Sequence, residues 1–399
     1  MTELWLVAVT AGQWQRHSIQ KARSIGLKVV AIDADPNAEG FIDADYSLNL
    51  PLDEVERVLG ALEDMKVNLR GAVSFVSDVG VPLAAAIRDH FDLPGPRPVV
   101  CERLVNKYLQ RRIWQQHGVP GPRVQLVETP ESAIEAIHSF GFPLIIKPAD
   151  SSGSRGVTKI ETLDADVLDA VKRAFQFSRS SKVLLESYMD GVEFTVETFS
   201  LCGKHHVLAV TEKKKVDGTN GTVARELATS QRPPQILNRI SKAAVDAYTA
   251  LGYEDGPGHA EVILMQDESV GLVEVAGRGG GFLVFDRFVP AVSGIDISRL
   301  TAMQAVGLDI GLLEPKVRAA VLRFFPSRPG RLVAIRGIEE ANALEGVEAG
   351  GIARLGDTFS LAAADGDRLG WILSRANTPA IAQERADLAE KLISFEIVL

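Results

Sequence analysis

Short apolar runs alternate with amphipathic stretches over about the first hundred residues of the chain. Alternation of buried strands with helices predicts a parallel sheet that carries helices on its faces. A segment rich in Pro and Gly follows at 92–98 and predicts a linker. We expect strands at 4–10, 29–33 and 72–76, and helices at 15–25 and 81–90.

The middle of the chain has a different pattern, which indicates antiparallel strands. Thr129 as a cap and Pro130 at the first helical position predict a helix that ends near residue 140. The other expected elements are strands at 143–147, 183–187, 195–201 and 207–211, a Gly/Ser-rich turn at 150–156, helices from about 164 and at 241–251, a polar loop at 213–232, and a hairpin of 259–265 with 270–275.

The last ninety or so residues are rich in short strands and turns. We expect strands at 320–325, 332–335, 353–362, 370–374 and 395–399, and a helix at 379–392. Together the patterns predict a fold of the α/β and α+β classes. Its expected parts are an N-terminal α/β domain at 1–100, a central α+β domain at 101–310, and a C-terminal β-rich domain at 311–399.

Composition and charge narrow the class of protein. The chain has 399 residues and a formal net charge of −9, which argues against nucleic acid as a partner. No apolar run is long enough for a transmembrane helix, and the amino-terminal run is short and follows an acid, so no membrane anchor or signal peptide is expected. Cys101 and Cys202 fit no metal-ligand spacing and favour a reduced, cytoplasmic setting.

Candidates for phosphate binding lie around the turn at 150–156. The chain lacks a Walker-type P-loop, and no GxGxxG fingerprint follows the first expected strand. Small residues in the turn would let backbone N–H groups approach an anion, although a mobile hairpin loop has the same composition. Lys147 ends the preceding apolar strand and is well placed to meet phosphate oxygens, whereas Lys107 alone is more simply a surface residue.

Two carboxylates in the expected hairpin are candidates for a metal site. Glu261 and Glu274 each lie in an apolar run, so pairing of the two strands could bring both to one face. Neighbouring carboxylates repel unless a cation lies between them, and Mg²⁺ takes oxygen ligands of this kind. Two solvent-facing acids are the alternative. Arg278, four residues beyond Glu274, is a candidate partner for an anion.

The segment that contains Glu186 and Glu193 could contact a nucleoside. An extended backbone can hydrogen-bond the edge of an adenine, and a carboxylate can accept from ribose hydroxyls. Neither feature is specific by itself. His205 and His206 lie between two expected strands, which favours a turn over a metal site.

The order of these features resembles the ATP-grasp superfamily of carboxylate–amine ligases. That order is a lysine, a second lysine with a Gly/Ser loop, Glu-x6-Glu, and Glu-x12-Glu followed by Arg and glycines. The resemblance covers about residues 100–310, and the preceding α/β domain is similar to the pre-grasp domain of that superfamily. It implies an ATP-grasp fold that binds ATP with Mg²⁺, or with Mn²⁺ in its place.

The resemblance also implies roles for the candidate residues. Lys107 and Lys147 would bind the nucleotide phosphates, and Arg278 would steady the transferred phosphoryl group, so Lys147 and Arg278 are the expected catalytic residues. Glu261 and Glu274 would hold magnesium. The remaining implied contacts are Ser151, Ser152, Gly153, Ser154 and Gly156 of a closing loop, Glu186, Ser187, Tyr188 and Met189 at the adenine, and Glu193 at the ribose.

One position departs from the superfamily pattern. Ala276 stands where a further Asn ligand is usual, so phosphates and water would have to complete the metal site, with one or two magnesium ions. A small residue at this position, together with the segments 321–329 and 356–379, resembles bacterial L-amino-acid ligases, which are dipeptide synthetases.

Substrate contacts are expected from two loops. In the polar loop, Arg225 and Glu226 could hold a carboxylate and an amine, although each could equally be an exposed loop charge. Gly280 and Gly281 belong to a second loop that could shape the acyl site. At the end of that loop, Asp286 and Arg287 could instead form a structural ion pair.

The implied function is ATP-dependent formation of an amide or peptide bond between a small-molecule carboxylate and an amine, with release of ADP and phosphate. One alternative is a carboxylase of the purine or biotin type in the same superfamily. Another is a catalytically silent nucleotide-binding protein, which Ala276 alone supports. Homodimerisation is common in the superfamily, but no residue of this sequence indicates it.

Overall fold

The structure is a computed structural model that describes residues 3–151, 153, 155–164, 166–216, 223–364 and 366–399. Ser152 and Ser154 of the expected closing loop therefore lie outside the described residues. Within these ranges, no helix is both long and apolar enough to cross a membrane.

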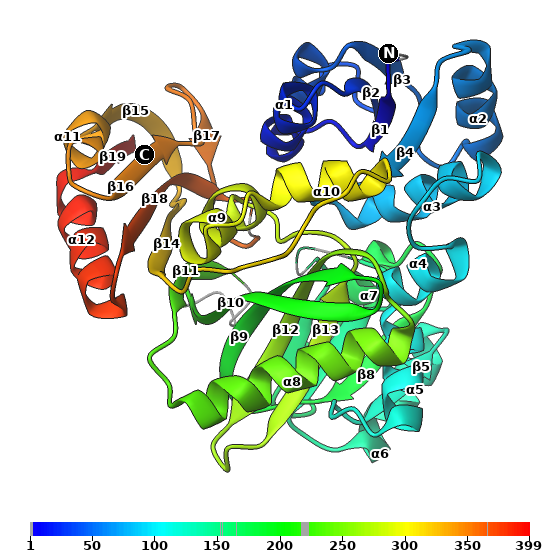
Figure 1. Cartoon of the computed structure of the whole chain (residues 1–399). Coiled ribbons are helices and arrows are strands. Elements are labelled where there is room, and N and C mark those ends of the chain that lie inside the picture. Colours follow the sequence, from blue (N-terminus) through cyan, green and yellow to red (C-terminus); the bar gives the residue numbers. More distant parts are fainter. Residues whose placement is uncertain (1–2, 152, 154, 165, 217–222, 365) are drawn as a thin grey trace.

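The N-terminal part of the chain forms a four-stranded parallel sheet in the order β3-β2-β1-β4, at the upper right of Figure 1. Leu6 and Ala8 of β1 pack in a cluster with α1, whereas Val7 and Val9 pack in another with α2 and α3. Helices thus cover both faces, and the predicted parallel sheet is confirmed. The elements are β1 (Trp5–Val9), η1 (Gln13–Gln15), α1 (Arg16–Ser24), β2 (Lys28–Asp33), η2 (Glu39–Asp43), β3 (Tyr46–Asn49), α2 (Val55–Asp64), β4 (Leu69–Val73), η3 (Asp78–Gly80) and α3 (Val81–His90).

A second, antiparallel sheet of four strands follows in the order β5-β8-β6-β7. Its helix α6 begins as predicted, because the Thr129 side chain accepts a hydrogen bond from the Ser132 backbone N–H at 3.1 Å. The elements are α4 (Pro98–Val105), α5 (Lys107–His117), β5 (Val124–Val127), α6 (Pro130–Phe140), β6 (Leu144–Pro148), β7 (Thr158–Ile160), α7 (Val167–Phe177) and β8 (Val183–Ser187).

The largest sheet has eight strands in the order β13-β12-β9-β10-β11-β14-β18-β16 and continues past residue 310 into the C-terminal part. Helix α8 packs on β9, β12 and β13, and lies across the front of the sheet in Figure 1. The elements are β9 (Gly191–Leu201), β10 (Lys204–Lys215), β11 (Ala224–Thr229), α8 (Pro234–Leu251), β12 (Gly256–Met265), β13 (Val270–Ala276), η4 (Val284–Phe288), α9 (Val289–Ser293), α10 (Ile297–Ala305), β14 (Ala319–Pro326), β16 (Val347–Gly351) and β18 (Arg368–Ala376).

The C-terminal part adds a small three-stranded sheet in the order β17-β15-β19. Its helix α12 (Pro379–Leu392) has the predicted bounds and packs on β14 and β18. The other elements are β15 (Gly330–Arg336), α11 (Ile338–Asn342), β17 (Thr358–Phe359) and β19 (Ser394–Val398).

Three predictions of local structure are wrong. The segment 213–232 is not one polar loop, because 213–215 end β10 and 224–229 form β11. His205 and His206 lie within β10 rather than in a turn. The expected strand at 353–362 is mostly turns with a two-residue strand, β17.

One hydrophobic cluster joins the three parts of the chain. It contains Leu6 of β1, Phe199 of β9 and Phe324 of β14, together with Phe285 and Phe288 of η4. The segment around η4 therefore lies where the N-terminal sheet, the eight-stranded sheet and the C-terminal part meet.

Candidate functional site

A cavity of about 520 Å³ lies between the antiparallel four-stranded sheet and the eight-stranded sheet. We call it the central cavity. Its volume is in the range of cofactor and substrate sites. The predicted site residues that line it are Lys107, Lys147, Ser151, Gly153, Glu186, Ser187, Tyr188, Met189, Glu193, Glu261, Glu274, Arg278 and Gly281.

Lys147 of β6 and Glu186 of β8 form a buried charge cluster on one face of the antiparallel four-stranded sheet. Lys147 Nζ lies 2.7 Å from Glu186 Oε2, and Arg111 Nε of α5 donates to Glu186 Oε1 at 2.9 Å. All three side chains are at most 5% exposed. Burial lowers the pKa of Lys147 to about 8, against the attraction of Glu186. Burial raises the pKa of Glu186, but the two cations outweigh it and the net pKa is lowered.

This cluster changes the interpretation of Glu186. Its carboxylate is occupied by Arg111 and Lys147, so it positions the lysine and leaves the backbone of 187–189 as the expected adenine contact. Arg111 was missed by the sequence analysis. It lies one helical turn after Lys107 on α5, and that spacing could have indicated a shared face.

Lys107 connects the phosphate and metal candidates. Its Nζ lies 2.9 Å from Glu274 Oε2 and donates to the Ser151 carbonyl at 2.6 Å. Burial lowers its pKa, but the Glu274 carboxylate outweighs burial and the pKa is raised, so the side chain is a cation. Lys107 is thus not a solvated surface residue, and it reaches toward the loop at 150–156.

The two metal candidates are direct partners in the β12–β13 ladder, because Glu261 pairs with Glu274 in register. The predicted approach of the two carboxylates is therefore confirmed. Glu261 Oε1 also accepts from Lys213 Nζ at 2.6 Å, and the pKa of Glu261 lies well below its usual range because Lys213 and His259 outweigh burial. Within the described ranges no group of three or more His, Cys, Asp or Glu side chains could hold a metal by itself.

The donor set still fits magnesium bound together with a nucleotide. Mg²⁺ is usually held by one or two carboxylates plus substrate phosphates and water, and Glu261 with Glu274 supplies two carboxylates. Ala276 of β13 is buried at 3% exposure and adds no oxygen ligand from its side chain.

Two lysines of β10 were missed by the sequence analysis. Lys213 forms an ion pair with Glu193, and Lys215 Nζ lies 2.8 Å from Glu193 Oε2. Both lysines line the central cavity, whereas the intervening Lys214 pairs with Glu226 at 2.7 Å. Side chains alternate between the two faces of a strand, so Lys213 and Lys215 share a face and Lys214 lies on the other. This alternation would have indicated the pair of cavity lysines if the segment had been recognised as a strand.

Arg278 follows β13 and makes a bidentate contact with the N-terminal part of the chain. Its Nε and Nη2 donate to the two Asp78 carboxylate oxygens at 3.0 and 2.8 Å. Burial raises the pKa of Asp78, but Arg278 outweighs burial and the pKa is lowered. Asp78 could not be identified from sequence, since it lies 200 positions from its partner.

His259 of β12 is a further residue of the cavity that the sequence analysis missed. Its Nδ1 lies 2.5 Å from the buried Glu197 carboxylate, and its Nε2 lies 3.9 Å from Glu261. Burial lowers the pKa of His259, but Glu197 outweighs burial and raises it to about 9. The imidazolium thus adds a positive charge beside Glu261.

The structure does not bring Arg225 and Glu226 to the central cavity. Both lie in β11, where Arg225 pairs with Glu390 of α12 and donates to a backbone carbonyl. Glu226 is 2% exposed and accepts from Arg323 Nε at 2.6 Å. These contacts hold α12 against the sheet.

The predicted site glycines differ in the space around their Cα atoms and in whether they line the central cavity. Gly281 lines the central cavity and has open space at its Cβ position. A Cβ at Gly280 would lie 2.8 Å from Val284 and 3.0 Å from His259, so this position needs glycine for close packing. Gly156 has φ +76° and packs against Pro148 and Phe177, outside the cavity lining.

Comparison with known proteins agrees with this geometry. Residues 140–286 match the model of an ATP-grasp domain, and residues 323–398 match the L-amino acid ligase C-terminal domain 2. A D-alanine--D-alanine ligase of Bordetella avium is 30% identical over 178 residues, which cover 43% of this chain and 55% of that protein. The match thus spans about half the length of that relative.

Two longer matches cover most of the chain. An uncharacterized protein of Sinorhizobium fredii is 27% identical over 350 residues, which are 83% of this chain and 70% of that protein. The crystal structure of an L-amino acid ligase from Bacillus licheniformis superposes with a TM-score of 0.85 at 22% identity and covers 100% of both chains. Residues 140–286 of this chain are therefore an ATP-grasp domain. Residues 323–398 are of the L-amino acid ligase C-terminal type, and the whole chain has the fold of that ligase.

Proposed function

We propose that the protein is an ADP-forming ligase that joins a small-molecule carboxylate, an amino acid, to an amine through an acyl phosphate. One observation carries the proposal. Two lysines, two paired carboxylates and an arginine line one cavity, although they come from segments scattered between residues 107 and 278. The D-alanine--D-alanine ligase and the L-amino acid ligase are named for reactions of this class and support it.

The chemistry needs activation because a carboxylate does not react with an amine at neutral pH. In the first step a carboxylate oxygen attacks the γ-phosphorus of ATP, and the bond to the bridging oxygen breaks to release ADP. In the second step the amine attacks the acyl carbon, and phosphate leaves from the tetrahedral intermediate with loss of a proton from nitrogen. Both steps depend on positioning and on neutralising negative charge.

The residues of the central cavity would have separate roles in these two steps. Lys107 and Lys147 would bind phosphate oxygens, and Arg278 would hold the transferred phosphoryl group. Glu261 and Glu274 would hold magnesium, which neutralises phosphate charge when bound. Closure of the loop at 150–156 would exclude water, which otherwise hydrolyses an acyl phosphate.

The remaining nucleotide contacts belong to the same proposal. The backbone of 187–189 would contact the adenine, and Glu193 would accept from the ribose hydroxyls. Mn²⁺ would substitute for Mg²⁺, since it also accepts carboxylate and phosphate oxygens. The substrates would be small molecules. The protein would act in the reduced setting of the cytoplasm.

The test is release of ADP and phosphate from Mg·ATP with amino acids supplied singly and in pairs, and with bicarbonate as a separate arm. Release that requires one pair, with one amide product by mass spectrometry, would support the ligase. Release that requires bicarbonate would indicate a carboxylase instead. ATP binding without release in any arm would overturn the proposal in favour of a silent nucleotide-binding protein.

A further inference from the structure

A smaller cavity of about 170 Å³ lies at the junction between the N-terminal part of the chain and the ATP-grasp domain. We call it the junction cavity. Its lining comes from the end of β4, helix α3, the loop 94–96, the start of β12 and helix α10, and the apolar part includes Val73, Val81, Ala84, Pro257 and Ala305. Cavities of about 150 Å³ accept a molecule of the size of benzene, so there is room for one small organic ligand.

Arg88 of α3 brings a positive charge to the wall of this cavity. The side chain is 6% exposed, and its partners are the carbonyls of Ala72 and Pro96, at 2.8 Å each, and the Cys101 sulfur at 3.3 Å. Burial raises the pKa of the Cys101 thiol, so this sulfur is a neutral partner. Burial also lowers the pKa of Arg88 from its ordinary value, since its partners do not fully offset the loss of water.

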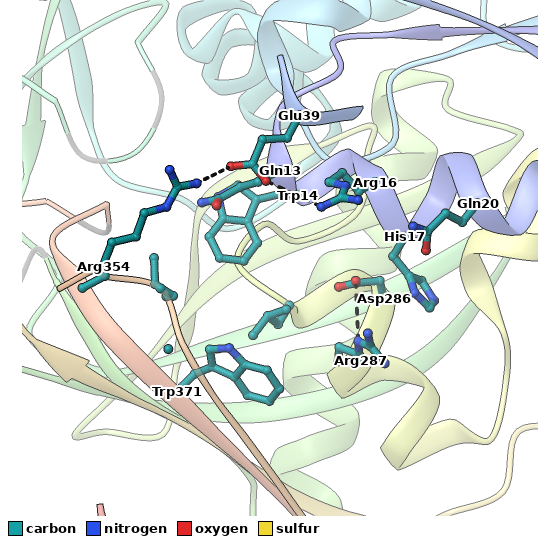
Figure 2. A pocket seen from close by; sticks show the side chains of 14 residues that line it. Gln13, Trp14, Arg16, His17, Gln20, Glu39, Asp286, Arg287, Arg354 and Trp371 are labelled. Carbon is teal, nitrogen blue, oxygen red and sulfur yellow. Dashed lines mark ion pairs between the residues drawn. The ribbon is translucent and has the colours of Figure 1, made fainter. Parts of the chain in front are cut away.

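Arg88 differs in this respect from other arginines of the protein. The buried Arg111 and Arg278 each have a carboxylate partner, at 2.9 and 2.8 Å. Figure 2 shows that even an exposed arginine has one, because Arg354 Nη2 lies 3.5 Å from Glu39 Oε1. Among the described residues, no carboxylate forms an ion pair with Arg88. A buried cation without a counter-charge is costly, so an anion that reached it would be stabilised.

Thr301 of α10 adds a second polar group to the wall of the junction cavity. Its side chain is 2% exposed, and its hydroxyl oxygen is buried without a hydrogen-bond partner among the described residues. Rotation about one bond lets a hydroxyl donate to a new acceptor. A cation and a hydroxyl that line one cavity, both in need of an acceptor, together fit a carboxylate.

The junction cavity is separate from the central cavity but lies next to one of its contacts. No described residue lines both cavities. Gly277 lines the junction cavity and directly precedes Arg278. Ser74 also lines it, and the Ser74 hydroxyl donates to the carbonyl of Ser77, which precedes Asp78. An occupant would therefore contact both segments that carry the Arg278–Asp78 pair, without meeting the residues assigned to ATP.

We propose that the junction cavity binds a small monocarboxylate with a short apolar chain, with its carboxylate at Arg88 and Thr301, as an effector that the reaction does not consume. The chain would pack on Val81 and Ala84 of α3. The binding site does not depend on the proposed ligase function, whereas an effect on turnover does.

Asp255 narrows the class of ligand further. It lines the same cavity, and its Oδ1 accepts from the Cys202 backbone N–H at 2.9 Å and from Gln304 Nε2 at 3.0 Å. A second negative charge on the ligand would be repelled by this carboxylate, which disfavours dicarboxylates and phosphate. An amide or an alcohol would leave the charge of Arg88 without a counter-ion.

The binding test is isothermal titration calorimetry of the full chain with 3-methylbutanoate at millimolar concentration. The neutral analogue 3-methylbutanamide and the dianion succinate should each bind at least about tenfold more weakly, because only the monoanion matches Arg88 alone. Acetate should also bind at least about tenfold more weakly, because it lacks the apolar chain. No binding of 3-methylbutanoate, or equal binding of the amide or of succinate, overturns the site.

Three variants locate the ligand. Arg88→Gln should weaken binding of 3-methylbutanoate at least about tenfold. Thr301→Val should weaken it about threefold, and it should raise the thermal midpoint of the unliganded protein because a buried unpaired hydroxyl is removed. Arg57→Gln, in an exposed pair on α2, is the control and should change nothing. If Arg88→Gln does not fold, unchanged affinity in Thr301→Val overturns the site.

The effector role is tested by ADP release at saturating substrates. An occupant that contacts the segments of Gly277 and Ser74 should steady the Arg278–Asp78 pair, so 3-methylbutanoate should raise kcat about fivefold. It should not be found in the amide product by mass spectrometry. Binding without a change in turnover, incorporation into product, or inhibition relieved by more amino acid overturns the effector role. Absence of turnover with every substrate pair would instead refute the ligase function, and calorimetry would still decide the site.

Discussion

The surroundings of Lys147 support its proposed role as a phosphate-binding cation. Its ammonium is 5% exposed and has the buried Glu186 carboxylate at 2.7 Å, which it shares with Arg111. The positive charge in this cluster exceeds the negative charge, so an anionic ligand would complete it. Phosphate oxygens are ligands of the right charge.

Lys147→Ala should lower kcat by about 10²–10³-fold, because one donor to the transferred phosphate is lost. Steady-state ADP release measures this. The exposed Lys172→Ala on α7 is the matched control and should have no effect. Near-normal turnover of Lys147→Ala would exclude the assigned role.

The lowered pKa of Lys147 predicts a pH dependence of ATP affinity. Only the protonated lysine attracts phosphate, so ATP affinity of the free protein should fall by up to about tenfold per pH unit above pH 8. Lys147→Arg stays charged and should flatten this profile in calorimetric titrations between pH 7 and 9.5. A profile that is equally steep in both proteins would contradict the interpretation.

The same pKa has an opposite consequence for stability. A lysine with pKa about 8 in the fold and 10.5 unfolded binds fewer protons when folded between these values. The contribution of Lys147 to the free energy of unfolding therefore rises with pH between about 8 and 10.5.

At the scale of elements, the β12–β13 hairpin shows what strand pairing can predict. Apolar runs with one acid each were enough to predict that Glu261 and Glu274 approach each other, because ladder register places paired residues side by side. The long strand β10 could not be recognised in the same way. Its end carries Lys213, Lys214 and Lys215, and three adjacent lysines resemble an exposed loop unless their carboxylate partners are known.

Glu274→Gln should abolish magnesium-dependent turnover, because an amide is a poorer ligand for Mg²⁺ than a carboxylate. Mn²⁺ affinity by electron paramagnetic resonance, in the presence of ATP, gives a readout independent of catalysis and should fall in parallel. The matched control is Glu268→Gln in the exposed turn of the same hairpin. Retained activity with unchanged Mn²⁺ affinity would refute the metal assignment.

The β11–β14–α12 network accounts for the placement of Glu226. Its carboxylate accepts from Arg323, which also contacts Asp387 and Glu390 of α12. Arg323 is 5% exposed, so removal of Glu226 leaves a buried guanidinium with fewer partners.

Glu226→Ala should lower the free energy of unfolding by about 3 kcal/mol, as for other broken buried ion pairs. Because Glu226 lies outside the central cavity, KM values for all substrates should stay unchanged at 25 °C. Glu396→Ala, in an exposed pair with Arg336, should change stability by less than about 0.5 kcal/mol. A raised substrate KM without loss of stability would restore the substrate role expected from sequence.

At the scale of the whole molecule, the contacts that complete the cavity span the full chain. Local patterns predicted most strands and helices, because periodicity is a property of neighbouring residues. Asp78 and Arg278 are 200 positions apart, and Glu197 meets His259 only through sheet pairing. Contacts of this kind depend on the packing of elements and could not be read from local spacing.

Asp78→Asn should lower kcat by about tenfold and leave the KM for ATP nearly unchanged. The Arg278–Asp78 contact spans two parts of the chain and fixes the guanidinium, so loss of one charge loosens its position. Asp89→Asn on the surface of α3 is the control. If the loss of kcat is fully accounted for by a loss of folded protein in thermal denaturation, the contact is merely structural.

The strand order of the large sheet has a consequence for how the protein is made. Strand β18 lies between β14 and β16, and its first residue, Arg368, lines the central cavity. A ribosome must therefore synthesise more than nine-tenths of the chain before this sheet and this cavity can be completed. Until then the edge of β14 that pairs with β18 stays open, and the central cavity lacks Arg368 from its lining.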